Sequence, residues 1–231
     1  MVLGYAFYMK WRQGMAVNTD ILFSSRSQVW GTRPEVYEAI RAKFKREYNI
    51  DPCALPETAK HANFITPEMD TFKVDWAEQF GLSEIRAFMN PEYGLAQQQF
   101  IDRLIQQIEL HTGYGEVLIP SRTDTKLFHE TLVRYADVLC FARNRAVFGT
   151  DEYWEWVWSE KTMKEINGKD RPNNLYGKVG TFSPAPFGSL VVSFTDASIA
   201  AGRKDKERRP KFDYMWMPKA VYKGVLVPWQ V

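Results

Sequence analysis

Hydrophobic positions in residues 30–148 follow two alternating periods. In some segments they recur every three or four residues, as on one face of a helix, and short apolar runs lie between these segments. The helical period predicts helices from Pro34 toward Tyr48 and over residues 75–80, 95–111 and 124–135. The apolar runs predict strands at 48–51, 85–90, 116–120 and 137–142. Strands that alternate with helices of this length predict an α/β fold with a mostly parallel sheet and flanking helices.

The start of the first helix has its own signal. Thr32 and Glu35 have the spacing of a capping box, and Pro34 falls in the first turn. We therefore expect the Thr32 hydroxyl to cap this helix.

The alternation breaks after Phe148. The next stretch contains Trp154, Trp156 and Trp158 together with several Gly and Pro residues, and a strand-like run resumes at 189–194. Inserted loops beside a rigid sheet often carry function, so the Trp-rich segment is either a target-recognition region or a structural subdomain. The pattern predicts four regions: an N-terminal extension (1–29), a core (30–148), an insertion (149–187), and a last core strand with a C-terminal tail (188–231). The aromatic residues of the tail are expected to pack back onto the core.

Composition is ordinary for a globular protein, since 45% of the 231 residues are hydrophobic and 25% are charged. The net charge of +2 means that any binding of nucleic acid must come from local patches. Neither the two cysteines nor the three histidines have metal-ligand spacing, so no metal is expected. No apolar run reaches the roughly 20 residues that span a membrane. These features, with the absence of a signal-peptide pattern, predict a cytoplasmic protein.

The most informative motif follows the strand at 85–90. Asn90, Pro91, Glu92 and Tyr93 stand at its end, and Gly94 closes the turn. An exocyclic amine on an aromatic ring is a poor nucleophile because its lone pair is delocalised. The Asn90 side-chain carbonyl and the Pro91 backbone carbonyl can accept its two N–H bonds, and Tyr93 can stack on the ring that carries the amine.

The motif resembles the (Asn/Asp)-Pro-Pro-Tyr signature of methyltransferases that modify exocyclic amines of DNA bases. The ordered set of segments between residues 28 and 195 resembles the phage-type Dam DNA N6-adenine methyltransferases. The set comprises 30–34 (Trp-Gly-Thr-Arg-Pro), 51–54 (Asp-Pro-Cys-Ala), 88–94, 118–125, 143–148 (Arg-Asn-Arg-Ala-Val-Phe) and 185–189 (Ala-Pro-Phe-Gly-Ser). This resemblance implies a Rossmann-like class I methyltransferase fold, S-adenosylmethionine as cofactor, double-stranded DNA as partner and a phage or prophage gene expressed in a bacterial cell.

The resemblance also implies a set of cofactor-binding residues. An acidic residue at the first strand's end can accept bonds from the cofactor's ammonium group, and a helix start favours its carboxylate. The implied residues are Trp30, Thr32, Pro34, Asp51, Pro52, Ala54 and Asp70. Glu68 competes with Asp70 for the adenosine end, Thr32 is equally well explained as a helix cap, and Phe64 either lines the adenine pocket or fills the core.

Basic residues near predicted strand ends are candidates for contact with DNA phosphates: Arg122, Lys126, Arg143 and Arg145. Residues 203–211 form a charge run with six basic and two acidic residues. This run is either a further DNA contact or an ordinary solvated surface.

One residue departs from the family pattern, because Glu92 replaces the usual second proline. Proline stiffens such a loop, whereas a carboxylate adds negative charge near a phosphate backbone. This departure leaves open a methyltransferase-like protein that binds DNA or a partner with reduced or no catalysis. The tetrapeptide also suits N4-cytosine methyltransferases and enzymes that methylate a glutamine amide, since all of these act on a planar –NH₂ group. The matches at 30–34 and 143–148 favour the adenine enzyme.

Overall fold

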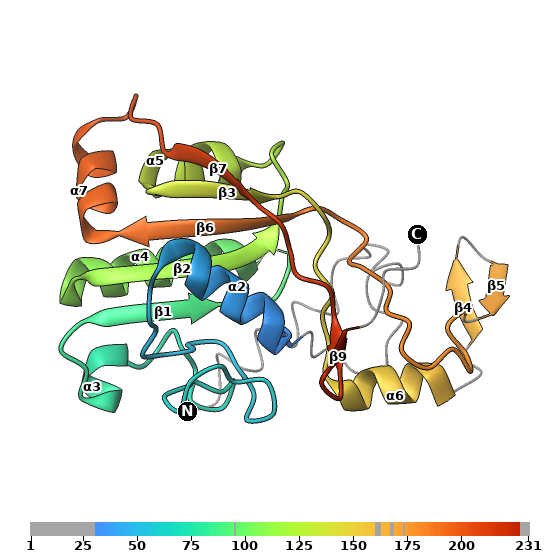
Figure 1. The fold of residues 1–231 in the computed structure, drawn as a ribbon. Coiled ribbons are helices and arrows are strands. Elements are labelled where there is room, and N and C mark those ends of the chain that lie inside the picture. The colour runs from blue at the N-terminus through green and yellow to red at the C-terminus, as the bar shows by residue number, and fades with distance from the viewer. Residues whose placement is uncertain (1–30, 95, 160–162, 167–168, 173, 227–231) are drawn as a thin grey trace. The chain divides into compact units, whose positions relative to one another are not determined.

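The computed structural model describes residues 31–94, 96–159, 163–166, 169–172 and 174–226 (Figure 1). The chain divides into two compact units. The larger unit comprises residues 29–151 and 180–231, and the smaller unit comprises residues 1–28 and 152–179. The predicted N-terminal extension lies outside the described residues.

The larger unit is built on a five-stranded mixed sheet with the strand order β1-β2-β6-β3-β7. β1 pairs with β2 and β3 pairs with β7 in parallel, whereas β6 runs antiparallel to its neighbours β2 and β3 (Figure 1). Four strands thus share one direction, as the alternation predicts, and β6, which follows the insertion, runs opposite to them. The strands are β1 Ile85–Met89, β2 Gly113–Pro120, β3 Val138–Ala142, β6 Ser189–Thr195 and β7 Lys211–Met215.

The predicted strand at 48–51 extends the sheet beyond β1. Ile50 forms a parallel bridge with Ala87, and Asp51 forms one with Phe64. The Phe88 N–H donates to the Ile50 carbonyl at 3.1 Å. The segment at 50–51 therefore lies between Phe64 on one side and β1 on the other. The chain first adds Phe64 on one side and then β1 on the opposite side, so the order of the strands changes direction between Ile50 and β1.

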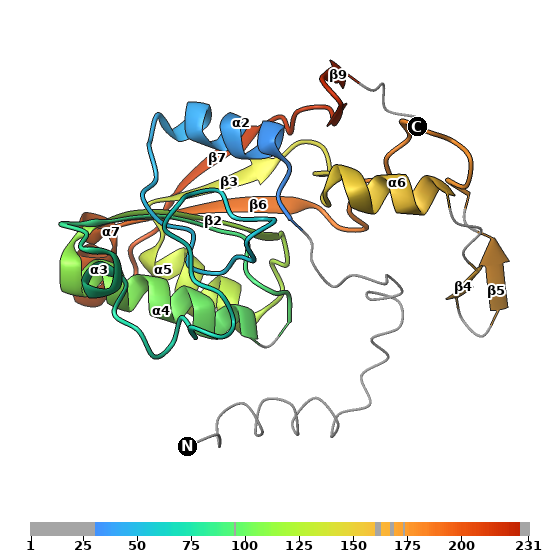
Figure 2. The ribbon, with the colours of Figure 1, turned by 90° about the horizontal axis from the view of Figure 1, so that it is seen from below.

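Helices cover both faces of the sheet (Figure 2). One face packs against α2 (Pro34–Phe44) through a cluster that includes Ile40, Phe88, Leu118 and Val191. The opposite face packs against the remaining helices of the larger unit. These are α3 Trp76–Phe80, α4 Ala96–His111, the π-helix η2 Leu127–Leu132, α5 Val133–Tyr135 and α7 Asp196–Lys204.

The capping prediction for α2 is wrong. The N-cap residue is Arg33, and its side chain makes no capping bond. The Thr32 hydroxyl oxygen is buried without a hydrogen-bond partner, and Glu35 accepts from Arg33 Nε at 2.8 Å instead. Pro34 does occupy the first turn, but the helix ends at Phe44, where Lys45 adopts a left-handed conformation, so Tyr48 lies beyond it.

The predicted helix at 124–135 begins later and in a different form. Thr125 precedes it, and its hydroxyl accepts from the Phe128 N–H at 3.2 Å. Residues 127–132 then form a π-helix before the short α5. The elements β1, α3, α4, β3 and β6 agree with prediction to within one residue at each end, and β2 begins at Gly113 instead of 116.

The aromatic residues after 211 only partly pack onto the core. Met215, Met217 and Ala220 are buried, whereas Tyr214 and Trp216 are largely exposed, which contradicts the predicted packing of those two residues. Trp229 lies outside the described residues. The tail forms a small hairpin of β8 (Val221–Tyr222) and β9 (Val225–Leu226).

The smaller unit contains α6 (Asp151–Ser159), whose first residue belongs to the larger unit, and an antiparallel hairpin of β4 (Met163–Ile166) and β5 (Lys169–Pro172). Trp154 and Trp158 are buried and lie four residues apart on one face of α6. Nowhere in the described chain is a helix both long and apolar enough to span a membrane.

Candidate active site

One edge of the sheet collects most of the candidate residues. Asn90 directly follows β1, Ser121 follows β2 and Arg143 follows β3, and β6 begins at Ser189 at this same edge because it runs in the opposite direction. We call this the carboxyl edge, since four strands end there. The carboxyl ends of parallel strands are where α/β sheets hold their ligands.

The Asn90 and Tyr93 side chains face each other across the turn after β1. The Tyr93 hydroxyl donates to Asn90 Oδ1 at 3.3 Å, and burial raises the pKa of Tyr93 above its ordinary value. Pro91 is buried, Glu92 is exposed, and Gly94 has a φ of 108°, a conformation that favours glycine. The amide oxygen of Asn90 is thereby held in place beside an aromatic ring.

Tyr93 belongs to an aromatic cluster drawn from three distant segments. Its ring centroid lies 5.2 Å from that of Phe187 and 6.4 Å from that of Phe148, and both contacts are edge-to-face. We call these three residues the aromatic cluster. Phe148 is fixed by a bridge to Thr32, and the segment of Phe187 is fixed where the Ser121 N–H donates to the Gly188 carbonyl at 2.9 Å.

Phe148 and Phe187 are further candidate site residues, which the sequence pattern did not single out. Both stand in segments that carry the family resemblance, at 143–148 and 185–189. Their only signal was membership of those segments, because their approach to Tyr93 depends on long-range pairing of the chain.

Asp51 lies deep at the carboxyl edge, next to the motif after β1. Its side chain is 5% exposed and accepts from the Lys60 backbone N–H at 3.1 Å. Burial raises the pKa of Asp51 to about 6. The backbone N–H groups of Lys60 and Cys53 favour the charged form and offset part of this rise. A carboxylate that is costly to bury and forms no ion pair with the described residues is poised to receive a cationic ligand group.

Cys53 links its own segment, 51–54, to the motif at 90–93. The backbone N–H of Asn90 points at its sulfur, and both Asp51 and Glu92 lie close enough to influence it electrostatically. Burial raises the pKa of the Cys53 thiol well above its ordinary value, which keeps the thiol neutral. The structure therefore brings the segments 51–54 and 90–93 together, as the resemblance implies.

The segment 31–34 lies at the same edge, and its residues differ in the contacts that they make. Arg33 is 3% exposed and ties the start of α2 to the chain near α6, since its guanidinium donates to the Gly149 carbonyl, to Asp151 and to the Val221 carbonyl. The Thr32 hydroxyl, by contrast, is left without a partner. Trp30 falls outside the described residues, so its predicted role stays a prediction.

The other cofactor candidates occupy less decisive positions. Pro52 and Ala54 are buried directly after Asp51, and the Ala54 N–H donates to the Ile65 carbonyl at 3.1 Å. Asp70 sits in a left-handed turn and pairs with Lys73 at 2.6 Å, so its carboxylate serves a local contact. Phe64 is half-buried beside Asp51, whereas Glu68 is exposed. Pro34 is exposed at the first turn of α2.

The four candidate DNA-binding residues lie at the carboxyl edge, after β2 or after β3. Lys126 stands at the start of the helical segment that contains η2, the others lie in loops, and all are exposed: Arg122, Lys126, Arg143 and Arg145. The charge run at 203–211 lies elsewhere. It begins in the last turn of α7 and ends at the first residue of β7, at the edge where the parallel strands begin (Figure 1). We call this the amino edge. The charge run is therefore at the opposite end of the sheet from Asn90.

Comparison with known proteins assigns the chain to a family. A family model described as DNA N-6-adenine-methyltransferase (Dam) matches residues 20–176, and the chain belongs to this family of DNA adenine-N6 methyltransferases. The DNA N-6-adenine-methyltransferase of Haemophilus phage HP1 (strain HP1c1) is 28% identical over 171 residues, which cover 74% of this chain and 87% of that protein. No solved structure matched the chain significantly.

The match refines the expected extent of the family region. It begins at residue 20, within the region predicted as an extension, and ends at 176, before the segment 185–189. The residues that the structure describes contain no group of three or more His, Cys, Asp or Glu side chains arranged to hold a metal ion.

Proposed function

We propose that this enzyme transfers a methyl group from S-adenosylmethionine to N6 of an adenine that has been taken out of double-stranded DNA, in the cytoplasm of a bacterial cell. The observation that carries the proposal is the placement of Asn90 and Tyr93 directly beside Asp51 and Cys53 at the carboxyl edge. This placement puts a group that can hold an amine next to a group that can hold a cationic cofactor.

The strand arrangement supports a Rossmann-like methyltransferase fold. The order of strands reverses between the bridge at Ile50 and β1, and Asp51 and Asn90 stand at the two carboxyl ends that flank this reversal. In open α/β sheets such a reversal opens the crevice that takes the ligand.

The residues at this point fit S-adenosylmethionine. The buried carboxylate of Asp51 would accept from the ammonium group, and the partnerless hydroxyl of Thr32, beside the start of α2, would donate to the carboxylate. Pro52 and Ala54 would line the methionine part, and Asp70 the adenosine part. When bound, the cofactor supplies a methyl group on a positively charged sulfur.

Asn90 and Pro91 would act on the adenine amine. The Asn90 Oδ1 atom, which now accepts from the Tyr93 hydroxyl, and the Pro91 carbonyl would accept the two N6–H bonds, which draws the nitrogen toward sp³ character and aims its lone pair. Tyr93 would stack on the base, and its edge contacts with Phe148 and Phe187 would hold the ring in position. Positioning then supplies most of the rate, and the N6 proton is lost to solvent.

DNA would reach the site along the carboxyl edge. Arg122, Lys126, Arg143 and Arg145 would contact phosphates there, where exposed cations add sequence-independent affinity. The insertion at 149–187, which contains α6 and the β4–β5 hairpin, would supply target recognition.

The test is transfer of labelled methyl from S-adenosylmethionine to unmethylated duplex DNA, followed by nucleoside digestion and mass spectrometry. N6-methyladenine is the expected product. N4-methylcytosine would keep the chemistry and overturn the target base. Cofactor binding without any product would overturn catalysis on DNA.

A further inference from the structure

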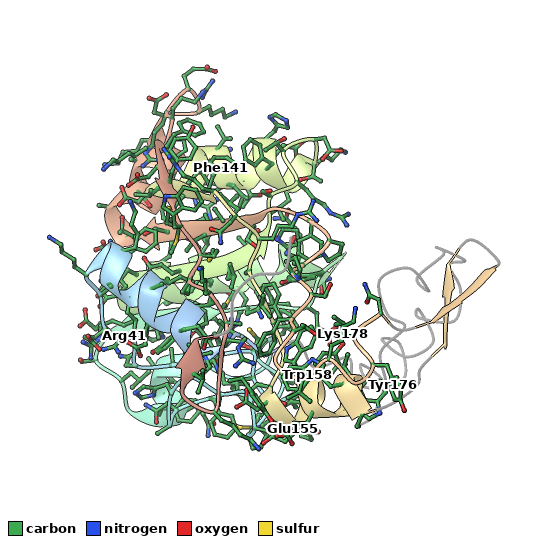
Figure 3. The ribbon with its side chains drawn as sticks, turned by 45° about the vertical axis from the view of Figure 1, so that its right-hand side comes forward. Arg41, Phe141, Glu155, Trp158, Tyr176 and Lys178 are labelled. Carbon is green, nitrogen blue, oxygen red and sulfur yellow. The ribbon has the colours of Figure 1, made fainter. Side chains whose placement is uncertain are left out.

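A row of exposed aromatic side chains lies along β7, the edge strand of the sheet, and at the residue that directly follows it. Phe212, Tyr214 and Trp216 occupy alternate positions and are 53%, 56% and 68% exposed. On the adjacent β3, Phe141 (labelled in Figure 3) stands opposite Tyr214 in the strand pairing. Its ring centroid lies 6.4 Å from that of Phe212 and 6.3 Å from that of Tyr214. We call these four residues the aromatic ridge. Single exposed aromatics are ordinary, but a contiguous group of this size marks an interaction surface.

The ridge is also cationic. The Arg143 guanidinium lies 5.4 Å from the ring centroid of Tyr214 and 5.9 Å from that of Trp216. Asp213 is the only carboxylate among residues 211–217, and it faces the other side of the sheet, where it pairs with Lys43 of α2 at 3.0 Å. The face therefore combines stacked rings and a guanidinium with no negative charge from its own strand.

We propose that the aromatic ridge binds unpaired bases of single-stranded DNA. Every base has a π-face, and aromatic side chains on an exposed sheet, joined by arginine, bind successive bases by stacking. The choice of DNA as the nucleic acid rests on the proposed function, since it is the substrate of that site.

Two other occupants fit the ridge less well. In a duplex the base faces are covered by their neighbours, so a row of protruding rings finds only edges and sugars there. A second copy of this chain would meet the ridge through a two-fold axis, which repeats each residue on both sides of the contact. The two Arg143 guanidinium groups would then share one interface, with no carboxylate of 211–217 on that face to neutralise them.

The aromatic ridge and the candidate active site are separate, but both reach the carboxyl edge of the sheet. β7 lies four strand spacings from β1, or roughly 19 Å at the usual spacing. The short segment from Arg143 to Phe148 links the ridge to the aromatic cluster around Tyr93. Trp216 is also fixed at the carboxyl edge, because the flanking Met217 exchanges two hydrogen bonds with Asn144 at 2.7 and 2.9 Å. A single strand that extends along this edge would therefore reach both sites.

The test measures the fluorescence anisotropy of a labelled oligo-dT of about 12 nucleotides, a length within the usual range for single-strand sites. The probe contains no adenine, so its binding is independent of methyl transfer. Tyr214→Ala with Trp216→Ala is expected to weaken binding by about tenfold or more, because each lost ring removes a stacked base. Tyr214→Phe with Trp216→Phe keeps the rings and is expected to bind as wild type.

Phe72→Ala removes an exposed aromatic from another surface, where it packs on Phe100, and is the matched control. Unchanged oligo-dT binding by the alanine pair would overturn the proposal. It would also be overturned if mass measurements showed a wild-type dimer that the alanine pair dissociates. If the double alanine variant fails to fold, Trp216→Ala alone, at the most exposed position of the row, replaces it in the binding assay. Duplex methylation is assayed in parallel: its absence in a wild-type protein that still binds oligo-dT through the ridge would reject the proposed function and support the ridge.

Discussion

The two edges of the sheet carry similar basic residues in different circumstances. At the amino edge, Arg203 donates to both carboxylate oxygens of Glu109 and to the Tyr135 hydroxyl, and Arg208 donates to the Ala136 carbonyl at 2.6 Å. At the carboxyl edge, Arg122 and Arg145 are exposed and form no ion pair within the described part of the chain. Arg203 and Arg208 therefore fasten α7 and the loop after it to α4 and α5, whereas Arg122 and Arg145 at the carboxyl edge keep their charge available to a partner.

Buried carboxylates show the same contrast. Glu116, in the middle of β2, accepts from Arg46 at 2.5 Å and from the Ser193 hydroxyl at 2.9 Å. Asp51, at the carboxyl edge, accepts backbone N–H groups and forms no ion pair with any described residue. An unpaired buried carboxylate costs stability, and such costs concentrate where a ligand offsets them. We therefore infer that binding belongs to the carboxyl edge of the sheet and that the paired charges elsewhere are structural.

The largest expected effect concerns the Asn90 side chain. Asn90→Ala removes the oxygen that would hold the adenine amine and should lower single-turnover methyl transfer about 100- to 1000-fold, the usual range for loss of one preorganised polar contact. Cofactor affinity, measured by calorimetry, should stay within about twofold. Gln99→Ala, on the exposed side of α4, is the control. Full turnover by the Asn90 variant would remove this residue from the mechanism.

Asp51→Asn should act on the cofactor instead. It removes the charge that would attract the ammonium group and should weaken S-adenosylmethionine binding about 10- to 100-fold, as loss of a charge-assisted contact usually does. Because the pKa of Asp51 is about 6, wild-type affinity should also fall by up to about tenfold per pH unit as the pH drops below 6. Asp51→Asn should abolish that pH dependence, and Glu57→Gln, an exposed carboxyl in the following loop, should preserve it.

The same substitution should stabilise the protein without cofactor. The folded pKa of Asp51 lies above its ordinary value of 3.8, so the folded state favours the protonated form, and this favourable contribution is lost as the pH rises from about 4 to 6. Above pH 6 the buried charge therefore costs up to about 3 kcal/mol. Denaturant unfolding at pH 7.5 should show a higher free energy of unfolding for Asp51→Asn. A lower value would mean that Asp51 is a structural residue.

The local elements of this fold could be predicted from the sequence, and the long-range pairings could not. Periodicity located β1 and α4 to within a residue because their apolar positions repeat without interruption. The capping box failed at Thr32 because Arg33 draws Glu35 into a buried ion pair. The order of β6 and the meeting of Tyr93 with Phe148 and Phe187 depend on contacts across the sheet, which leave no local pattern.

Removing cations from each edge in turn sharpens the comparison between the edges. Arg122→Ala with Arg145→Ala should weaken binding to unmethylated duplex about tenfold at low salt. It should also reduce the slope of log affinity against log salt by about two, since each lost phosphate contact reduces it by roughly one. Lys204→Ala with Lys206→Ala removes two exposed cations of the amino edge and should leave both quantities unchanged. Equal losses in the two double variants would refute the distinction.

The smallest effect should come from Glu92, the negative residue that departs from the family pattern at the carboxyl edge. Its side chain is exposed, so solvent and salt screen its repulsion of a phosphate backbone, and Glu92→Gln should raise duplex affinity only about twofold at low salt. The gain should vanish near roughly 0.5 M salt, where screening is nearly complete. Glu78→Gln, an exposed carboxyl in α3, should produce no gain. If both substitutions raised affinity equally, the repulsion would come from net charge and not from the position of Glu92 beside Asn90.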